Sequence, residues 1–330
     1  VTQHCKEFDH ITFYVSSPKI VASHLIKCYG FQKYAIMGLE NGCRNTSAIA
    51  VKNGNVIMVF KGALRPLHSC PDDPLVDDIH RHVATHGDAV HDVAFQVDDI
   101  YTAVQLAENG GAKILEQPHE TNDQFGQIII AKVAGLSDVV HTFVNRVNYT
   151  SFLPGFKLEQ LDKKSNPVLN LDAIDHCVQN QDWNQMERAC LYYKKAFGFH
   201  VFWSVDEKQV YTEYSALKST VMASPMEGIK MPINEPATGL KKSQIEEFVE
   251  FNSGSGIQHI AIRTNNIVDS VKKMRDMGVD FIDVPPEYYT NLEKRLKMEE
   301  HPKIKETMKV VKKCGLLVDF DDKGYLLQLF

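Results

Sequence analysis

The feature that most constrains the fold of this chain is an internal repeat that occurs four times. Each copy has a short apolar strand, a stretch with helical spacing, and a glycine before a further strand; the copies begin at FDHITFYV, VHDVAFQV, IDHCVQN and IQHIAIRT. A repeat of this kind means that one supersecondary unit is copied along the chain. His10 and His176 are 166 residues apart, and Asp92 and His259 are 167 residues apart. The sequence therefore predicts two tandem halves, each built from two units.

Within each unit, the first strand and helix should be followed by further strands. VKNGNVIMVF has the pattern of a hairpin that turns at Asn53 and Gly54. The stretch LEQLDKKSNPVLN is polar and contains a proline, as is typical of a connection between domains. We therefore predict a first domain at 1–155, a linker at 156–169 and a second domain at 170–330.

The last unit differs from the second in two ways. It contains a charged and mostly helical insertion, PPEYYTNLEKRLKMEEHPKIKETMKVVKKCG. It is also shorter at its end: Gly126 aligns with Gly324, and the first half continues through the strand DVVHTFVNR, whereas six residues follow Gly324. We therefore expect the second half to lack its closing strand here and the native chain to extend past Phe330.

Composition limits the classes of partner. The net charge is −6, which gives no electrostatic reason to bind nucleic acid or an anionic membrane surface. No apolar run approaches the ~20 residues that a membrane-spanning helix needs. The seven cysteines are widely spaced, without a CxxC pair, which favours a reducing compartment over a disulfide framework or a thiolate zinc site. A small-molecule partner is the expectation.

The sharpest chemical signal is a pair of histidines at equivalent places in the second half. His176 and His259 each lie within the first strand of their unit. If the two units pair their sheets about a pseudo-twofold axis, both imidazoles point into one cavity. With one carboxylate they would form a 2-His-1-carboxylate site, which leaves positions open on a divalent metal. The alternative is that both are core histidines satisfied by hydrogen bonds.

The first half serves as an internal control. Its equivalent residues are His10, Asp92 and, on the closing strand, Thr142. One histidine and one aspartate without a strong third ligand make a degenerate site. We therefore expect the first domain not to bind a metal.

Several polar residues are weaker candidates. KMPINEP sets Asn234 and Glu235 between two prolines, which either aims an amide into a pocket or forms a rigid turn. Gln258 precedes His259 and should face the opposite side of the strand unless a bulge intervenes. Gln328 and Phe330 alternate with the inward positions of the last strand. KKSQIEEFVEF is most simply a solvated helix face.

Longer stretches of the chain resemble a known family. The segments LDAIDHCVQNQ, IKMPINEPATGLKKSQIEEFVEF, GSGIQHIAI and LVDFDDKGYLLQLF closely resemble the 4-hydroxyphenylpyruvate dioxygenase family, and GLENGCR and VNYTSFLPGF extend the resemblance to the first half. The resemblance implies an α+β vicinal-oxygen-chelate fold with four βαβββ modules in two open barrels, the last module truncated. It also implies an Fe(II) enzyme that turns 4-hydroxyphenylpyruvate and O₂ into homogentisate and CO₂ in tyrosine and phenylalanine catabolism, without 2-oxoglutarate. A cytoplasmic homodimer is expected on the same basis.

The resemblance also assigns roles to residues. It implies that His176 and His259 are iron ligands and that a glutamate on a strand beyond Phe330 is the third. The family positions that line the substrate pocket match Ser219, Asn234, Gln244, Gln258, Gln328 and Phe330, with the last packing on the substrate ring. Because strand alternation argues against Gln258 facing the pocket, its role in this interpretation is to orient His259.

Two alternatives stay open on the sequence. A hydroxymandelate synthase uses the same substrate and iron but hydroxylates the benzylic carbon, so only the product separates the two enzymes. A non-catalytic binding module follows if the native chain ends at Phe330, because two histidines alone would hold iron weakly.

Overall fold

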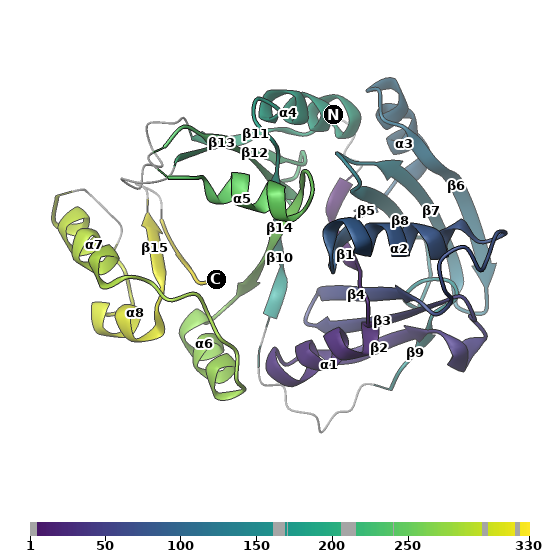
Figure 1. Ribbon diagram of the computed structural model, residues 1–330, viewed down its shortest axis with the longest axis horizontal. Helices are drawn as coiled ribbons and strands as arrows, with labels where there is room; N and C mark the ends of the chain where they lie inside the picture. The colour runs from purple at the N-terminus through teal and green to yellow at the C-terminus, as the bar shows by residue number, and fades with distance from the viewer. Residues whose placement is uncertain are drawn as a thin grey trace.

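The computed structural model describes residues 5–160, 169, 171–205, 216–239, 241–298, 303–320 and 324–330. Its strands form a nine-stranded sheet in the first half, a five-stranded sheet in the second half and a separate two-stranded sheet. In Figure 1 the first half, coloured purple to teal, lies to the right, and the green and yellow second half lies to the left. The fold is the mixed α+β arrangement that the repeat predicts.

The first half follows the order strand, helix, three strands twice. The first unit contains β1 (Cys5–Tyr14), α1 (Pro18–Cys28), β2 (Gln32–Met37), the short 3-10 helix η1 (Leu39–Asn41), β3 (Thr46–Asn53) and β4 (Val56–Ala63). After the connecting helix α2 (Pro74–His86), the second unit contains β5 (Ala89–Val97), α3 (Ile100–Asn109), β6 (Ile114–Asp123), β7 (Gly126–Ala134) and β8 (Val140–Arg146). The two units join through the antiparallel pair β1–β5, and each unit closes with its last strand parallel to its first.

The second half repeats this order. Its first unit contains β10 (Leu171–Asn180), α4 (Met186–Phe197), β11 (His200–Val205), β12 (Ala216–Ala223) and β13 (Lys230–Ala237). The connecting helix α5 (Gln244–Phe251) leads to β14 (Gly256–Thr264), α6 (Ile267–Asp276), α7 (Pro286–Met298), α8 (Met308–Cys314), β15 (Leu317–Phe320) and β16 (Tyr325–Gln328). The antiparallel pair β10–β14 takes the place that β1–β5 takes in the first half.

Local sequence signals account for many of these boundaries. Asn53 ends β3, and Gly54 turns the predicted hairpin with a φ of +58°. A side chain on Gly54 would also meet the carbonyl oxygen of Leu171 at 1.9 Å, because the hairpin approaches the start of β10. Helix α4 ends at Gly198, whose φ of +69° is the left-handed cap that the glycine pattern predicts.

The two halves share one hydrophobic core. A single buried cluster includes Phe95 and Phe143 from the first half and Phe197 and Phe199 from the second. Helices α3 and α4 pack against each other, so closely that a side chain on Gly110 would lie 2.3 Å from the carbonyl oxygen of Lys195. The halves are therefore positioned by side-chain packing and by close backbone contact.

The described parts of the predicted insertion, 285–298 and 303–315, are mostly helical, as expected, and have their own core. Helices α7 and α8 pack with β15 and β16 around the buried side chains of Val271, Tyr289, Leu292, Val311, Cys314, Leu316 and Val318. In the first half β8 lies between β7 and β5, whereas β15 and β16 form a separate two-stranded sheet. The end of the chain lies between this pair and the β10–β14 strands (Figure 1).

The stretch predicted as a linker contains a short strand. β9 (Lys157–Leu158) pairs with β2 at the edge of the first sheet. Residues 161–168 of the predicted linker, and residue 170 at the start of the predicted second domain, lie outside the described residues. The domain boundaries stay a prediction. No helix in the described ranges is long and apolar enough to cross a membrane.

Candidate metal and substrate site

The two histidines of the second half face each other. His176 lies on β10 and His259 on the neighbouring strand β14, and their ring centroids are 5.9 Å apart with the planes at 73°. Two imidazoles on one ion have centroids up to roughly 6.5 Å apart when each nitrogen is about 2.1 Å from the metal. The observed separation is therefore within the range that one ion between them can bridge.

A β-bulge resolves the expected conflict at Gln258. Ile257 and His259 pair with the consecutive residues Gln179 and Val178, so Gln258 is the extra residue of a bulge on β14. Its Oε1 lies 3.1 Å from Nδ1 of His259. Simple alternation would have turned Gln258 away from the ring, and the bulge brings its side chain to it.

Asp175 stands in the same relation to His176, and the sequence analysis missed it. Ile174 and His176 pair with the consecutive residues Ile262 and Ala261, so Asp175 is also the extra residue of a bulge. Its Oδ2 lies 2.8 Å from Nδ1 of His176. The signal was present in the sequence, because an aspartate precedes the histidine in both FDH and IDH.

These contacts occupy Nδ1 of both rings and leave Nε2 as the nitrogen that can bind a metal. Burial, together with the neighbouring His176, lowers the pKa of His259 to about 4, so this ring is neutral near pH 7. A neutral imidazole with an acceptor at its other nitrogen is the form that ligates metals. The two histidines thus fit a metal centre chemically. No three histidine, cysteine, aspartate or glutamate side chains of the described ranges converge as a metal site, so these residues supply two ligands.

Phe330 closes one side of this pair. Its ring centroid lies 5.2 Å from that of His259, with the rings nearly perpendicular at 87°. The backbone N–H of Ile282 donates a hydrogen bond to the Phe330 carbonyl oxygen at 2.7 Å, which holds the end of the chain. Gln328 is the last residue of β16, opposite Leu317 and two residues before Phe330.

A row of polar side chains crosses the five-stranded sheet beside the histidines. Asn180 of β10 pairs with Asn234 of β13, and Asn234 pairs with Ser219 of β12. Directly paired residues share a face, and Asn180 shares the face of His176 because they are four residues apart on one strand. The Asn234 amide donates to Oδ1 of Asn180 at 3.3 Å, and both residues are buried. Sequence reasoning missed Asn180, although its even spacing from His176 could have indicated it.

The remaining candidate residues of this region lie in different surroundings. KMPINEP lies in strand β13, so the alternative of a rigid turn is wrong. Glu235, next to Asn234, accepts a hydrogen bond from the backbone N–H of Met186 at 3.0 Å and so binds the start of α4. Gln244 is the first residue of α5 and is exposed.

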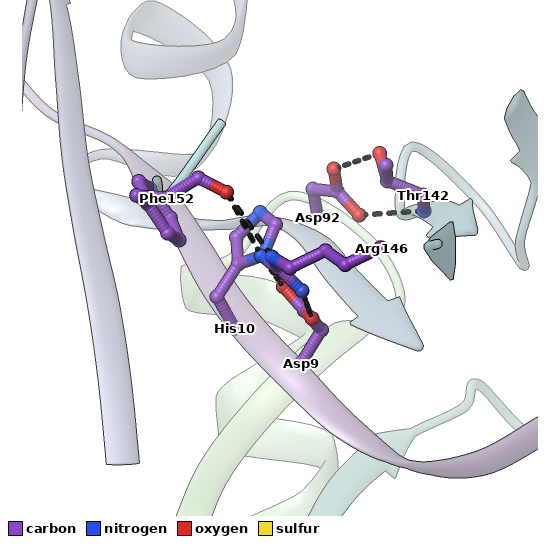
Figure 2. Close-up of polar contacts among 6 residues, drawn as sticks. All are labelled: Asp9, His10, Asp92, Thr142, Arg146 and Phe152. Atoms are coloured by element: carbon purple, nitrogen blue, oxygen red, sulfur yellow. Dashed lines mark hydrogen bonds and ion pairs between the residues drawn. The ribbon is translucent and has the colours of Figure 1, made fainter. Parts of the chain in front are cut away.

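The equivalent place in the first half is closed by its own side chains (Figure 2). Thr142 donates hydrogen bonds to Asp92 from its backbone N–H, at 3.0 Å, and from its hydroxyl. Nδ1 of His10 lies 2.6 Å from Asp9, which is also ion-paired with Arg146. The ring of Phe152 packs edge-on against His10 with centroids 5.3 Å apart. The three predicted equivalents, His10, Asp92 and Thr142, are thus engaged within the protein.

The sequence of the second half, which contains the histidine pair, matches a superfamily model. Residues 173–329 match the Glyoxalase/Bleomycin resistance protein/Dioxygenase superfamily. The chain is 45% identical to 4-hydroxyphenylpyruvate dioxygenase from Aspergillus fumigatus over 98% of this chain and 83% of the relative. It is 46% identical to the protein of that name from Yarrowia lipolytica, over 98% and 82%. The chain belongs to the 4-hydroxyphenylpyruvate dioxygenase family.

Solved structures agree with this assignment. A mutant of 4-hydroxymandelate synthase from Streptomyces coelicolor superposes with a TM-score of 0.81 at 25% identity, covering 99% of this chain and 88% of that one. A fusion protein described as xylose isomerase-like TIM barrel/4-hydroxyphenylpyruvate dioxygenase gives a TM-score of 0.74 at 17% identity, over 100% of this chain and 47% of that one. The second likeness concerns the fold alone, and both confirm the fold class predicted from the repeats and the family resemblance.

Proposed function

We propose that this protein is an Fe(II)-dependent dioxygenase that converts 4-hydroxyphenylpyruvate and O₂ to homogentisate and CO₂, a step in tyrosine and phenylalanine catabolism. One observation carries the proposal: two imidazoles face each other 5.9 Å apart on paired strands. They do so in a chain that shares 45% of its residues with a curated 4-hydroxyphenylpyruvate dioxygenase.

In this proposal His176 and His259 hold the metal through Nε2, and the third protein ligand is a glutamate beyond Phe330. When bound, a divalent iron supplies open coordination positions for the keto acid and O₂ together with redox chemistry that the side chains lack. The substrate brings its own 2-oxo acid group, so 2-oxoglutarate is not required. The acceptors at Nδ1 keep both rings oriented before the metal arrives.

The polar row is suited to orienting the substrate. Asn234 and Ser219 offer amide and hydroxyl groups that form hydrogen bonds without adding a charge. Asn180 holds the Asn234 amide at 3.3 Å, which limits the directions in which that amide can point. We infer that this row binds a polar part of the substrate and sets its distance from the metal.

The other predicted pocket residues act from different sides. Phe330, beside His259, offers an apolar ring against which an aromatic substrate can pack. Gln258 acts through His259 and does not need to touch the substrate. Gln328 and Gln244 stay predicted substrate contacts, from the end of β16 and the start of α5.

The test is product analysis. The purified protein, loaded with Fe(II) and supplied with 4-hydroxyphenylpyruvate in air, should consume O₂ and release homogentisate and CO₂ in equal amounts. Alanine at His176 or His259 should abolish turnover, whereas alanine at His10 in the first half should not remove the metal. Full turnover by either of the first two variants would contradict the proposal.

A second candidate reaction on the same substrate is the synthesis of 4-hydroxymandelate. It follows from the structural likeness to 4-hydroxymandelate synthase, at a TM-score of 0.81. That enzyme class would give 4-hydroxymandelate from the same incubation. The curated relatives at 41–46% identity carry the dioxygenase name, so we favour homogentisate. Chromatography of the product separates the two outcomes directly.

The compartment and assembly belong to the same proposal. All seven cysteines are free thiols, which is consistent with the reducing cytoplasm that we propose for this protein. We also propose a homodimer, on the family resemblance. Light scattering of the purified protein measures the assembly state.

A further inference from the structure

The carboxylate of Asp175 contacts His176 at Nδ1, the ring nitrogen that is not proposed to bind the metal. Asp175 is the extra residue of a bulge in β10, and the bulge turns its side chain to the ring of the next residue. Oδ2 of Asp175 lies 2.8 Å from Nδ1 of His176. A carboxylate near pH 7 can only accept hydrogen bonds, so the imidazole must donate from Nδ1.

The second oxygen of this carboxylate has a partner as well. Nζ of Lys230, the first residue of the paired strand β13, lies 4.0 Å from Oδ1 of Asp175. The carboxylate therefore lies between an imidazole and an ammonium group. This arrangement keeps Asp175 charged and limits its rotation, because each oxygen has its own partner.

The first half contains the same arrangement of a bulged aspartate, a histidine and a cation. Asp9 is the extra residue of a bulge in β1, lies 2.6 Å from Nδ1 of His10, and pairs with the guanidinium of Arg146. Figure 2 shows the carboxylate of Asp9 beside the His10 ring and the Arg146 guanidinium. Two strands 166 residues apart thus place an aspartate at the same ring nitrogen, and a cation from another strand, Arg146 of β8 or Lys230 of β13, pairs with each aspartate. Chance contact of an exposed side chain does not account for a duplicated bulge, carboxylate and cation.

The two proposed metal ligands have different hydrogen-bond acceptors at Nδ1. His259 receives the neutral amide oxygen of Gln258 at 3.1 Å, whereas His176 receives a charged oxygen at 2.8 Å. A hydrogen bond to an ionised acceptor is roughly twice as strong as one between neutral groups. His176 is therefore the ring whose orientation depends most on its neighbour.

We propose that Asp175, held by Lys230, is a positioning residue that fixes His176 in the tautomer with hydrogen on Nδ1 and directs Nε2 to the metal. This inference rests on the proposed function, because it assigns a metal to the histidine pair. It assigns Asp175 no contact with substrate. Substitution of Asp175 should therefore change the tautomer of the His176 ring and the affinity for metal, and both can be measured without turnover.

A matched control is available in the same cavity. A cavity of about 590 Å³ between the halves is lined by Asp175 and Lys230 and also by Asp172 and Arg263. Asp172 accepts from Nε of Arg263 at 2.8 Å and lies three residues before Asp175 on the same strand. Asp172→Asn removes the same charge from the same cavity without touching an imidazole.

The first measurement is the tautomer of His176 in the metal-free protein, read from ¹⁵N chemical shifts of the ring. The wild type and Asp172→Asn should show hydrogen on Nδ1. Asp175→Ala should show a mixture of tautomers. Asp175→Asn, which keeps an acceptor oxygen without its charge, should lie between them, and Lys230→Met should shift the ring in the same direction by less.

The second measurement is the dissociation constant of Co(II), titrated calorimetrically into each protein. We expect about a 10- to 100-fold weaker affinity for Asp175→Ala and wild-type affinity for Asp172→Asn. With metal saturating, kcat should fall more than KM rises. An unchanged tautomer with affinity within about 2-fold of wild type would overturn the proposal. Wild-type affinity in His176→Ala would instead reject the proposed metal site itself, so the two failures are distinguishable.

Discussion

Tyr193 offers the most quantitative test of how the two halves are joined. Its side chain is fully buried, and its hydroxyl lies 3.0 Å from Nε2 of His141 in the first half. The same hydroxyl donates to Oε1 of Gln179 on β10 at 2.9 Å. Tyr193→Phe keeps the ring and removes the hydroxyl. The hydroxyl has one proton, which it donates to Gln179, so the change removes one donated hydrogen bond and one buried polar neighbour of His141.

The magnitude follows from the number of groups left unpaired. A buried polar group without a hydrogen bond costs about 1–3 kcal/mol, so the loss of the one donated bond predicts a loss of about 2 kcal/mol in the free energy of unfolding. Urea unfolding at pH 7, followed by circular dichroism, measures this loss. Metal stoichiometry should not change, because the histidine pair keeps its own neighbours.

The neighbouring tyrosine is the control. Tyr192 donates its hydroxyl to the carbonyl oxygen of Ala134 and is only partly buried, so water can replace the lost bond. Tyr192→Phe should therefore cost no more than about 1 kcal/mol. If Tyr193→Phe were no more destabilising than Tyr192→Phe, the buried chain of polar contacts would not join the halves in the way described.

Three further outcomes follow from the structure. Burial lowers the pKa of His141 to about 4, so between pH 6.5 and 4 the unfolded chain binds a proton that the folded chain does not. The free energy of unfolding should therefore fall by about 3 kcal/mol as the pH drops through that window. His141→Gln should flatten this part of a pH series of urea melts, and an unchanged slope would contradict the assignment. Asn234→Ala should lower kcat/KM about 10- to 100-fold while Co(II) affinity stays at the wild-type value, and a loss of metal binding would mean that Asn234 is structural. Gly110→Ala should lower the free energy of unfolding by about 2 kcal/mol, because its new methyl group would meet the Lys195 carbonyl at 2.3 Å, and a neutral result in thermal melts would show that the helices can separate freely.

Much of the fold and part of the site could be predicted from the repeat in the sequence. The offset between His10 and His176 predicted two matched halves. The convergence of His176 and His259 was expected on the condition that the two units of a half pair, and β10 and β14 do pair, as β1 and β5 do. Periodicity also placed the helical insertion and the hairpin at Gly54 correctly. These features depend on local patterns of apolar residues and glycines, which are visible in one sequence.

The bulges could not be derived in the same way. A bulge depends on how two strands align their hydrogen bonds, and no single-residue property of Gln258 or Asp175 announces it. Strand alternation therefore set Gln258 on the wrong face, and Asp175 was overlooked although FDH and IDH repeat. The closing of the first-half site by Arg146 and Phe152 also depends on residues far from His10 in the chain.

The central claim is that one metal binds between His176 and His259 in the second half and none binds at the equivalent place in the first. Anaerobic calorimetric titration of Fe(II) into the purified protein tests it most directly. The account predicts one Fe(II) per chain in the wild type and in His10→Ala, and loss of tight binding in His259→Ala. Unaltered binding in His259→Ala, or loss of binding in His10→Ala, would contradict it.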